Sequence, residues 1–276
     1  MSNDLRTWLE KADARGWLKK VDGADWDLEL GGIAELIRLG DDSPALLFDH
    51  IKGYPPGFRV AANTSRSPRL VSLTLGLPEE VTHKERLEAL RQKLPQWEAS
   101  LSKFAPVVVK DGPVLGNVLS GPEVDLLHFP VPRWHEHDGG RFIGTGDAVI
   151  TKDPDTGAVN LGCYRVQVHD GRTAGLNMTP GKHGRLHRDK YHNRGKPCPV
   201  AVSVGHHPLV FRAAGSTLPE GVEYRYIGAI RGEPVEVVEE ELTGLPIPAD
   251  SEIVLVGWCP PGKTRREGPF GEFAGY

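Results

Sequence analysis

The chain has 276 residues, 33 basic and 37 acidic side chains, and a formal net charge of −4. This length allows one large domain or two smaller ones, and the mixed charges offer no basic face for nucleic acid or an anionic membrane. Three scattered cysteines, no apolar signal segment and no run near the ~18 apolar residues of a membrane span predict a soluble, cytoplasmic protein without disulfides.

The first part of the chain is predicted to form a small α/β domain over residues 1–105. Leu5, Trp8, Leu9 and Ala12 recur at helical spacing behind Asp4, which is a suitable N-cap. In chain order the predicted elements are helices at 4–14 and 27–39, strands at 45–48 and 58–62, and an amphipathic helix at 79–93.

The second part, residues 106–276, is predicted to be a β-rich domain of barrel or sandwich type. The turn sequence from Asp153 to Gly157 separates two strand candidates, so residues 147–168 are expected to form a hairpin. The predicted strands lie at 106–109, 147–151, 164–168, 200–204, 224–230, 235–238 and 253–256.

Asn160 and Arg165 are the first candidate site residues. An Asn amide oxygen is a ligand for a hard divalent cation, and the Arg fork matches a phosphate or carboxylate. Their odd separation places them on opposite faces of an ideal strand. They share one site only if Gly162 marks a bulge or if Asn160 precedes the strand. A turn Asn and a surface Arg are the structural alternative.

His183 and His187 are spaced i,i+4, which can place both on one helix face for metal binding. Gly184 occupies the position where the zincin motif needs Glu, so the spacing alone favours exposed polar histidines. Glu223 lies at the mouth of the strand predicted at 224–230. It is either a metal ligand or a solvated edge residue.

Glu267 and Glu272 are two carboxylates separated by a Gly-Pro-Phe-Gly segment that restricts and turns the backbone. Paired carboxylates near an Arg can hold different protonation states, one ionised and one able to donate a proton. The alternative is a solvated turn. Rossmann and Walker phosphate loops and the Gly-x-Ser-x-Gly elbow are missing from the sequence, which disfavours those nucleotide folds and serine hydrolases.

Taken in order, these motifs resemble the UbiD-type decarboxylases along essentially the whole chain. The resemblance implies an α+β fold in which the small α/β domain precedes a split-barrel, flavin-reductase-like domain that binds the cofactor. The segments that carry it are 46–57 (Leu-Leu-Phe-Asp-His-Ile-Lys-Gly-Tyr-Pro-Pro-Gly), 130–136 (Pro-Val-Pro-Arg-Trp-His-Glu), 160–165 (Asn-Leu-Gly-Cys-Tyr-Arg), 228–236 (Gly-Ala-Ile-Arg-Gly-Glu-Pro-Val-Glu) and 267–276 (Glu-Gly-Pro-Phe-Gly-Glu-Phe-Ala-Gly-Tyr).

The resemblance implies that prenylated FMN is bound together with Mn²⁺ or Mg²⁺ and with K⁺. Asn160, His183 and Glu223 would be the metal ligands, with the cation bridging to the flavin phosphate. Lys182 stands where the ferulic acid decarboxylase branch carries Gln. The implied cofactor-binding residues are Asn160, Leu161, Gly162, Cys163, Tyr164, Arg165, Lys182, His183 and Glu223.

The implied reaction is the reversible, non-oxidative decarboxylation of an aromatic or α,β-unsaturated acid, with the flavin as electron sink. Arg165, Glu267 and Glu272 would form the catalytic network. Arg165 would orient the substrate carboxylate, Glu272 would donate the proton to carbon, and Glu267 would tune both. A flavin prenyltransferase would supply the cofactor.

Members of this family are commonly near twice as long. Their C-terminal α/β domain provides a cofactor-contacting Lys, closes over the substrate and builds the dimer. This domain is expected to be absent here. A homo-oligomer or a second subunit would then complete the pocket. One alternative is a non-catalytic or partial subunit that needs a partner chain. Another is an unrelated metal-dependent hydrolase that uses His183, His187 and Glu223.

Overall fold

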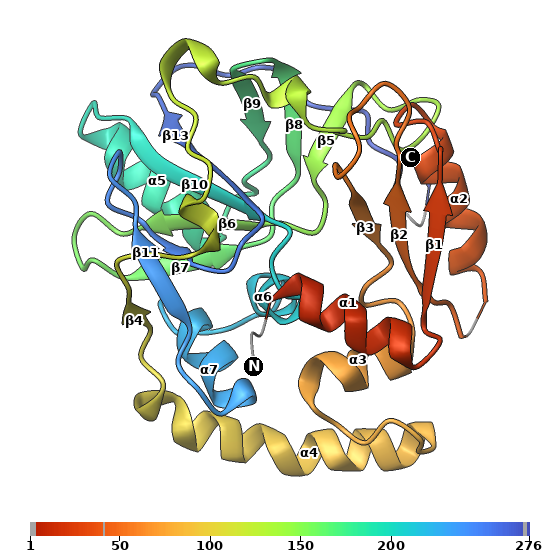
Figure 1. Cartoon of the computed structure of the whole chain (residues 1–276). Coiled ribbons are helices and arrows are strands. Elements are labelled where there is room, and N and C mark those ends of the chain that lie inside the picture. The colour runs from red at the N-terminus through yellow and green to blue at the C-terminus, as the bar shows by residue number, and fades with distance from the viewer. Residues whose placement is uncertain (1–3, 41, 273–274) are drawn as a thin grey trace.

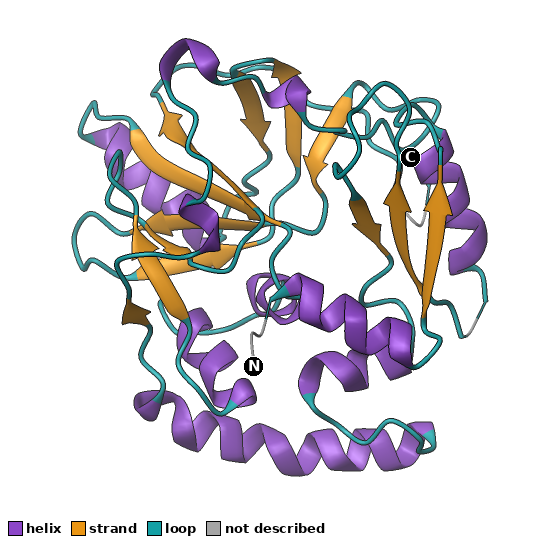
Figure 2. Ribbon diagram, viewed as in Figure 1, coloured by secondary structure: helices purple, strands orange, loops and turns teal. Residues whose placement is uncertain are grey.

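The computed structural model describes residues 4–40, 42–272 and 275–276. It has the mixed α+β architecture that the sequence predicts, with a small α/β unit on one side and a β-rich unit on the other (Figures 1 and 2). Within the described residues, no helix combines the length and the apolar character needed to cross a membrane.

The small unit is a three-stranded sheet covered by helices on both faces. Strand β2 (Ala45–Asp49) pairs in parallel with β1 (Leu18–Asp22) and antiparallel with β3 (Val60–Ala62). Four of the five β2 residues are buried, as expected for a central strand between two layers. The helices are α1 (Leu5–Ala14) and α3 (Pro68–Leu75) on one face and α2 (Glu29–Arg38) on the other.

The predicted cap of the first helix is confirmed, because the Asp4 carboxylate accepts a hydrogen bond from the Thr7 N–H at 2.8 Å. The long helix α4 (His83–Ser100) begins with a reciprocal capping box between Thr82 and Glu85. It runs beneath both units in Figure 1, and it packs through its C-terminal half and the 3-10 turn η1 (Leu101–Lys103) against α7 (Glu223–Arg231).

The β-rich unit contains three sheets in the described residues, with strand orders β13-β10-β6-β7, β5-β8-β9 and β12-β11-β4. Short 3-10 helices η2 (Pro113–Leu115), η3 (Gly121–Glu123) and η4 (Leu126–His128) lead into it. The strands are β4 (Val107–Val108), β5 (Arg141–Gly144), β6 (Ala148–Lys152), β7 (Val159–Gly162), β8 (Val166–Asp170), β9 (Thr173–Leu176), β10 (Cys198–Val204), β11 (Glu236–Glu239), β12 (Pro246–Pro248) and β13 (Ile253–Cys259).

Alternating side chains of the four-stranded sheet fill two separate cores. Val149 faces one core and its neighbour Ile150 faces the other, since successive strand residues point to opposite faces. Helix α5 (His183–Asn193) covers the first face, whereas α6 (Pro208–Ala214) and α7 cover the second. This layering brings the N-terminal ends of α5 and α7 to the same hairpin, β6–β7.

Two sequence-based predictions were wrong in detail. The segment predicted as a strand at 224–230 is helix α7, because Tyr224, Ile227 and Gly228 are buried at helical spacing and Gly232 ends the helix in a left-handed conformation. The hairpin predicted at 147–168 closes earlier, since β6 pairs with β7 and the following strand β8 pairs with β5 and β9 in another sheet.

Candidate active site

Arg165 stands between two carboxylates that come from the far end of the chain. Its Nε and Nη2 donate to the two oxygens of Glu267 at 2.8 and 3.1 Å, and its Nη1 donates to Glu272 at 2.7 Å. This bidentate geometry is the strongest form of a guanidinium–carboxylate pair. The Glu267 side chain is 19% exposed and that of Glu272 is 56% exposed, so only Glu272 is openly accessible.

Further contacts fix the arrangement of this trio. The Asn177 amide donates to the second oxygen of Glu267 at 2.9 Å, and the Asn177 N–H donates to the Arg165 carbonyl at 3.0 Å. The Arg165 guanidinium also lies 5.1 Å from the centre of the Phe270 ring, within cation–π range. Glu267 is therefore held in place on both of its oxygens.

The segment from Glu267 to Glu272 is docked through its backbone. The Gly268 N–H donates to Gln167 at 3.1 Å, and the Gly271 N–H donates to the buried Asp138 carboxylate at 2.7 Å. A Cβ on Gly139 would lie 2.1 Å from the Gly268 carbonyl oxygen, so only glycine permits this approach. Phe273 and Ala274, which belong to the same sequence motif, lie outside the described residues.

Asn160 and Arg165 do not share a strand, which resolves the problem of their odd spacing. Strand β7 ends at Gly162 and β8 begins at Val166, so Asn160 lies on β7 whereas Arg165 lies in the connection that precedes β8, a strand of another sheet, and a bulge is not required. Tyr164 and Arg165 are adjacent, with Tyr164 buried and Arg165 partly exposed. One peptide bond thus connects the surroundings of Asn160 to the Arg165 network.

Tyr164 lies between the segments that carry the three predicted metal ligands. Its phenol accepts a hydrogen bond from the N–H of Gly184, which follows His183, and it also interacts with the Asn160 side chain. Burial raises the pKa of Tyr164, and the nearby Glu223 charge raises it further. The Glu223 carboxylate in turn accepts from the backbone N–H of Leu161, next to Asn160.

Glu223 is the first residue of helix α7, where the sequence analysis had placed it at the mouth of a strand. Its carboxylate is buried, and burial raises its pKa to about 7. Among the described residues, Glu223 Oε2 is a buried carboxylate oxygen that lacks a hydrogen-bond partner. Buried polar atoms are normally paired, so this unpaired oxygen fits a cation that the carboxylate would coordinate.

The other predicted cofactor-binding residues differ in which of their groups are free to contact a ligand. The Leu161 side chain is in the hydrophobic core, which leaves only its backbone free for a ligand. The Tyr164 ring lies where a Cβ on Gly162 would be, at 2.3 Å. Lys182 is the exposed N-cap residue of α5, so its ammonium is close to the helix N-terminus where anions bind.

Cys163 is held as a neutral thiol beside an acid that the sequence analysis did not select. Its Sγ donates to Asp147 Oδ1 at 3.6 Å, and burial raises the pKa of the thiol to about 12. Asp147 is fully buried, and burial raises its pKa to about 7. Asp147 occurs in the Thr-Gly-Asp-Ala segment that precedes β6, but no sequence pattern marks it as buried.

His187 is not available to the hydrolase alternative. It lies on α5 with His183, as their spacing allowed, but its Nε2 donates to Glu220 at 2.7 Å and its Nδ1 is 3.0 Å from Thr151 Oγ1. The contacts that surround Glu223 involve Leu161 and Tyr164 instead. The ligand set His183, His187 and Glu223 is therefore not supported by the structure.

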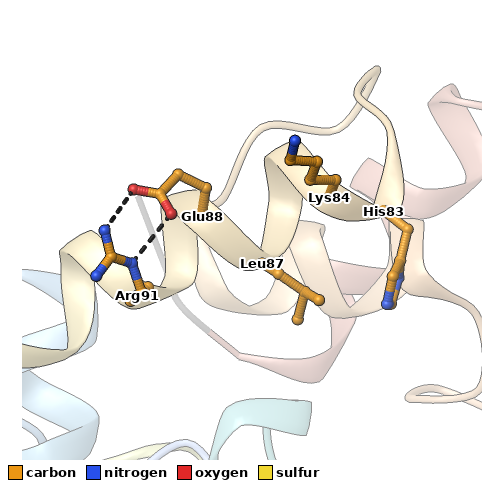
Figure 3. Close-up of a pocket in the computed structure, with 5 residues that line it drawn as sticks. All are labelled: His83, Lys84, Leu87, Glu88 and Arg91. Carbon is orange, nitrogen blue, oxygen red and sulfur yellow. Dashed lines mark hydrogen bonds and ion pairs between the residues drawn. The ribbon is translucent and has the colours of Figure 1, made fainter.

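Two cavities lie outside these clusters. A depression on the exposed face of α4 is lined by His83, Lys84, Leu87, Glu88 and Arg91, and none of these residues was predicted to be functional (Figure 3). A cavity of about 790 Å³ lies between the α/β unit and the β-rich unit. Thr145, Gly146 and Phe270 are among the residues that line this cavity, and Phe270 is also the residue whose ring contacts the Arg165 guanidinium.

Several residues that build the site carried no detectable sequence signal. Asn177, Gln167 and Asp138 are single polar residues whose roles depend on contacts across 90 or more residues of the chain. Phe270 was visible only as part of the Gly-Pro-Phe-Gly segment. Burial and long-range pairing, which a single sequence does not report, are what distinguish these residues.

Two family profiles match the chain. The N-terminal domain of 3-octaprenyl-4-hydroxybenzoate carboxy-lyase, UbiD_N, matches residues 9–90, and the Rift-related domain of the same carboxy-lyase, UbiD, matches residues 106–276. Among curated proteins, a pyrrole-2-carboxylic acid decarboxylase of Pseudomonas aeruginosa is 37% identical over 258 residues, which cover 91% of this chain and 51% of the relative. A phenolic acid decarboxylase of Streptomyces sp. strain D7 is 35% identical over 87% of this chain and 50% of the relative.

Solved structures show the same fold. The vanillic acid decarboxylase of Sedimentibacter hydroxybenzoicus in its closed form matches with a TM-score of 0.90 and 31% identity, over 99% of this chain and 58% of the other. The UbiD-class enzyme HmfF of Pelotomaculum thermopropionicum in complex with FMN matches with a TM-score of 0.85 and 28% identity, over 99% and 58%. The chain spans about half the length of the curated relatives it matches.

Proposed function

The chain belongs to the UbiD family of carboxy-lyases, and from this membership we propose that it acts in the non-oxidative decarboxylation of an aromatic or α,β-unsaturated carboxylic acid. The single observation that carries the proposal is the Arg165 trio, in which one guanidinium bonds two carboxylates from 102 and 107 residues away. High CO₂ would run the same chemistry towards carboxylation.

We propose prenylated FMN as the cofactor, with Mn²⁺ or Mg²⁺ held by Asn160, His183 and Glu223, and with K⁺. The buried Glu223 carboxylate oxygen, which lacks a hydrogen-bond partner among the described residues, supports a hard-cation site, and one imidazole beside two oxygen ligands is compatible with Mn²⁺. When bound, the flavin would supply the electron sink for loss of CO₂. The cation would also ionise Glu223, whose pKa burial raises to about 7.

The protein's own groups would handle the carboxylate and the proton. The Arg165 fork would orient the substrate carboxylate, since its position is fixed by the bidentate bond to the partly buried Glu267. Glu272 would deliver the proton to carbon, because its side chain is the more exposed of the two carboxylates and bonds Arg165 through one oxygen. Glu267 would act as a positioning residue for Arg165.

The test is to co-express the chain with a flavin prenyltransferase, purify it, and record flavin absorbance, metal content and release of CO₂ from pyrrole-2-carboxylate and vanillate. Flavin absorbance with Mn²⁺ that is lost in Asn160→Ala and His183→Ala supports the proposal. A folded but colourless and metal-free protein would contradict it for the chain alone. That result would favour a partial subunit that a second polypeptide or another copy completes.

A further inference from the structure

A chain of hydrogen bonds, buried except at Glu220, connects the elements that carry the three predicted metal ligands. Its centre is His187, whose side chain is 0% exposed. His187 Nε2 is 2.7 Å from a Glu220 carboxylate oxygen and His187 Nδ1 is 3.0 Å from Thr151 Oγ1. Because a carboxylate only accepts, Nε2 carries the proton, and the Thr151 hydroxyl can donate to Nδ1 of a neutral ring. We call Thr151, His187 and Glu220 the His187 clamp.

Each member of the clamp is attached to a different ligand-bearing element. Thr151 is the direct cross-strand partner of Asn160 in the β6–β7 hairpin, so the two side chains share one face of the sheet. His187 lies one helical turn after His183 on α5, and on the same side of the helix. Glu220 precedes Glu223 by three residues, at the entrance to α7.

We propose that the His187 clamp sets the relative positions of Asn160, His183 and Glu223, and thereby the affinity of the site for a divalent cation and a flavin phosphate. The inference rests on the proposed function, because it assigns His187 and Glu220 as positioning residues for the cofactor of that reaction. Within the described residues, the clamp joins all three of these elements through side-chain hydrogen bonds.

A cation within the clamp itself is a weaker interpretation. Ligand atoms of Asp153, His187 and Glu220 lie within 4.8 Å of one another, a spacing that a metal ion could bridge. However, Lys190 is already ion-paired to Asp153 through its ammonium, and His187 has a hydrogen-bond partner on each ring nitrogen. A positive ammonium on one of the three groups repels a second cation, which favours a structural role for the cluster.

The test compares two variants at the accessible end of the clamp. Glu220→Ala removes both the acceptor and the charge, whereas Glu220→Gln removes the charge but keeps an oxygen that can accept from His187. The Kd for FMN is measured by flavin fluorescence with saturating Mn²⁺. A positioning role predicts a loss of about 10–100-fold in Glu220→Ala, the range typical of partners that orient metal ligands, and recovery to within about threefold in Glu220→Gln.

Asp189→Asn is the matched control, because Asp189 is a partly exposed acid on α5 that, unlike Glu220, pairs with Arg185 and Arg188 outside the clamp. It should leave the Kd unchanged. Equal losses in Glu220→Ala and Glu220→Gln would mean that charge alone matters, and an unchanged Kd in Glu220→Ala would mean that the clamp positions nothing. Either result overturns the inference.

A second measurement keeps the inference testable if the unsubstituted protein binds no FMN, a result that would count against the proposed function alone. Hydrogen exchange of the backbone amides at residues 183–187 and 220–224 reports how firmly α5 and the entrance to α7 are held. The clamp predicts exchange about tenfold faster in Glu220→Ala than in Glu220→Gln over both segments. Equal exchange rates in the two variants would refute it.

Discussion

The two halves of the candidate site differ in how they satisfy their polar groups. In the Arg165 network, the guanidinium donates to both carboxylates and Asn177 also donates to Glu267, so these charges are paired within the protein. Around Tyr164, by contrast, the buried Glu223 carboxylate has an oxygen that lacks a hydrogen-bond partner among the described residues. Under the proposed function, the first half would already be assembled for the reaction, and the second would be completed by a bound cation.

This difference has a physical consequence for each half. In a network of paired charges, hydrogen bonds fix the positions of the side chains with little loss of stability, because each charge is neutralised by its neighbour. Unpaired buried groups destabilise the protein by about 1–3 kcal/mol each until a partner arrives. Removing a member should therefore damage the chemistry of the first half and the ligand affinity of the second.

Arg165→Met should produce the largest effect. Glu267 and Glu272 would lose the guanidinium that they share, and no group would orient the substrate carboxylate. The rate of decarboxylation by the flavin-loaded protein should therefore fall by about 10³-fold, which is the effect of removing an electrostatic stabiliser of the transition state. The rate of CO₂ release measures this, with the exposed Arg172→Met on the β8–β9 turn as control. Activity within tenfold of the unsubstituted protein would show that the network is not catalytic.

Glu272→Gln should follow, with a loss of about 10²-fold, because the amide keeps the shape and cannot donate an acidic proton to carbon. Flavin absorbance should be unchanged, since Glu272 lies outside the ligand cluster. The exposed Glu241→Gln serves as control. Retained turnover in Glu272→Gln would remove this residue as proton donor and would leave the Arg165 network with an orienting role only.

Glu223→Gln tests the predicted metal ligands and should weaken Mn²⁺ binding by about 100-fold. This loss of affinity is at or above the upper end of the range seen when a residue that orients a metal ligand is removed. Isothermal titration with Mn²⁺ measures it, and the exposed Glu239→Gln is the control for lost charge. Thermal stability of the metal-free protein should not fall, because the variant no longer carries a buried carboxylate. An unchanged Mn²⁺ affinity would exclude Glu223 as a ligand.

Asp147→Asn should give the smallest effect, on stability alone. Burial raises the pKa of Asp147 from 3.8 to about 7. Between these values the unfolded chain has released the proton and the folded protein still holds it, so stability is greatest at low pH and falls as the pH rises towards 7. The free energy of unfolding should drop by about 1.4 kcal/mol from pH 5.5 to 6.5. Denaturant titration should show this slope lost in Asp147→Asn, and an equal slope in both proteins would contradict it.

The sequence predicted the helices and strands better than it predicted which of them pack or pair with one another. The helix behind Asp4 and the strand at 45–48 were found because capping and periodicity are local signals. The helix at Glu223 was mistaken for a strand because its short apolar run, Tyr-Arg-Tyr-Ile-Gly-Ala-Ile, also satisfies alternation. Its buried face became visible only with its packing against β7 and α4.

The candidate site shows the same limit. Glu267 and Glu272 were selected because a constrained segment separates them, and Asn160, His183 and Glu223 were selected by resemblance. Spacing alone argued against joining Asn160 to Arg165, since it assumed one continuous strand. The break between β7 and β8 removes this objection, but it depends on which strands pair, and pairing is a property of the tertiary structure.

The peptide bond between Tyr164 and Arg165 couples the two halves in a way that matters for engineering. A substitution that shifts this backbone, for example at Gly162, would displace the ligand cluster and the Arg165 guanidinium together, because Tyr164 packs where a Gly162 Cβ would lie. A substitution at Thr145, in the wall of the cavity between the two units, would instead leave the β7–β8 connection and the Arg165 network as they are.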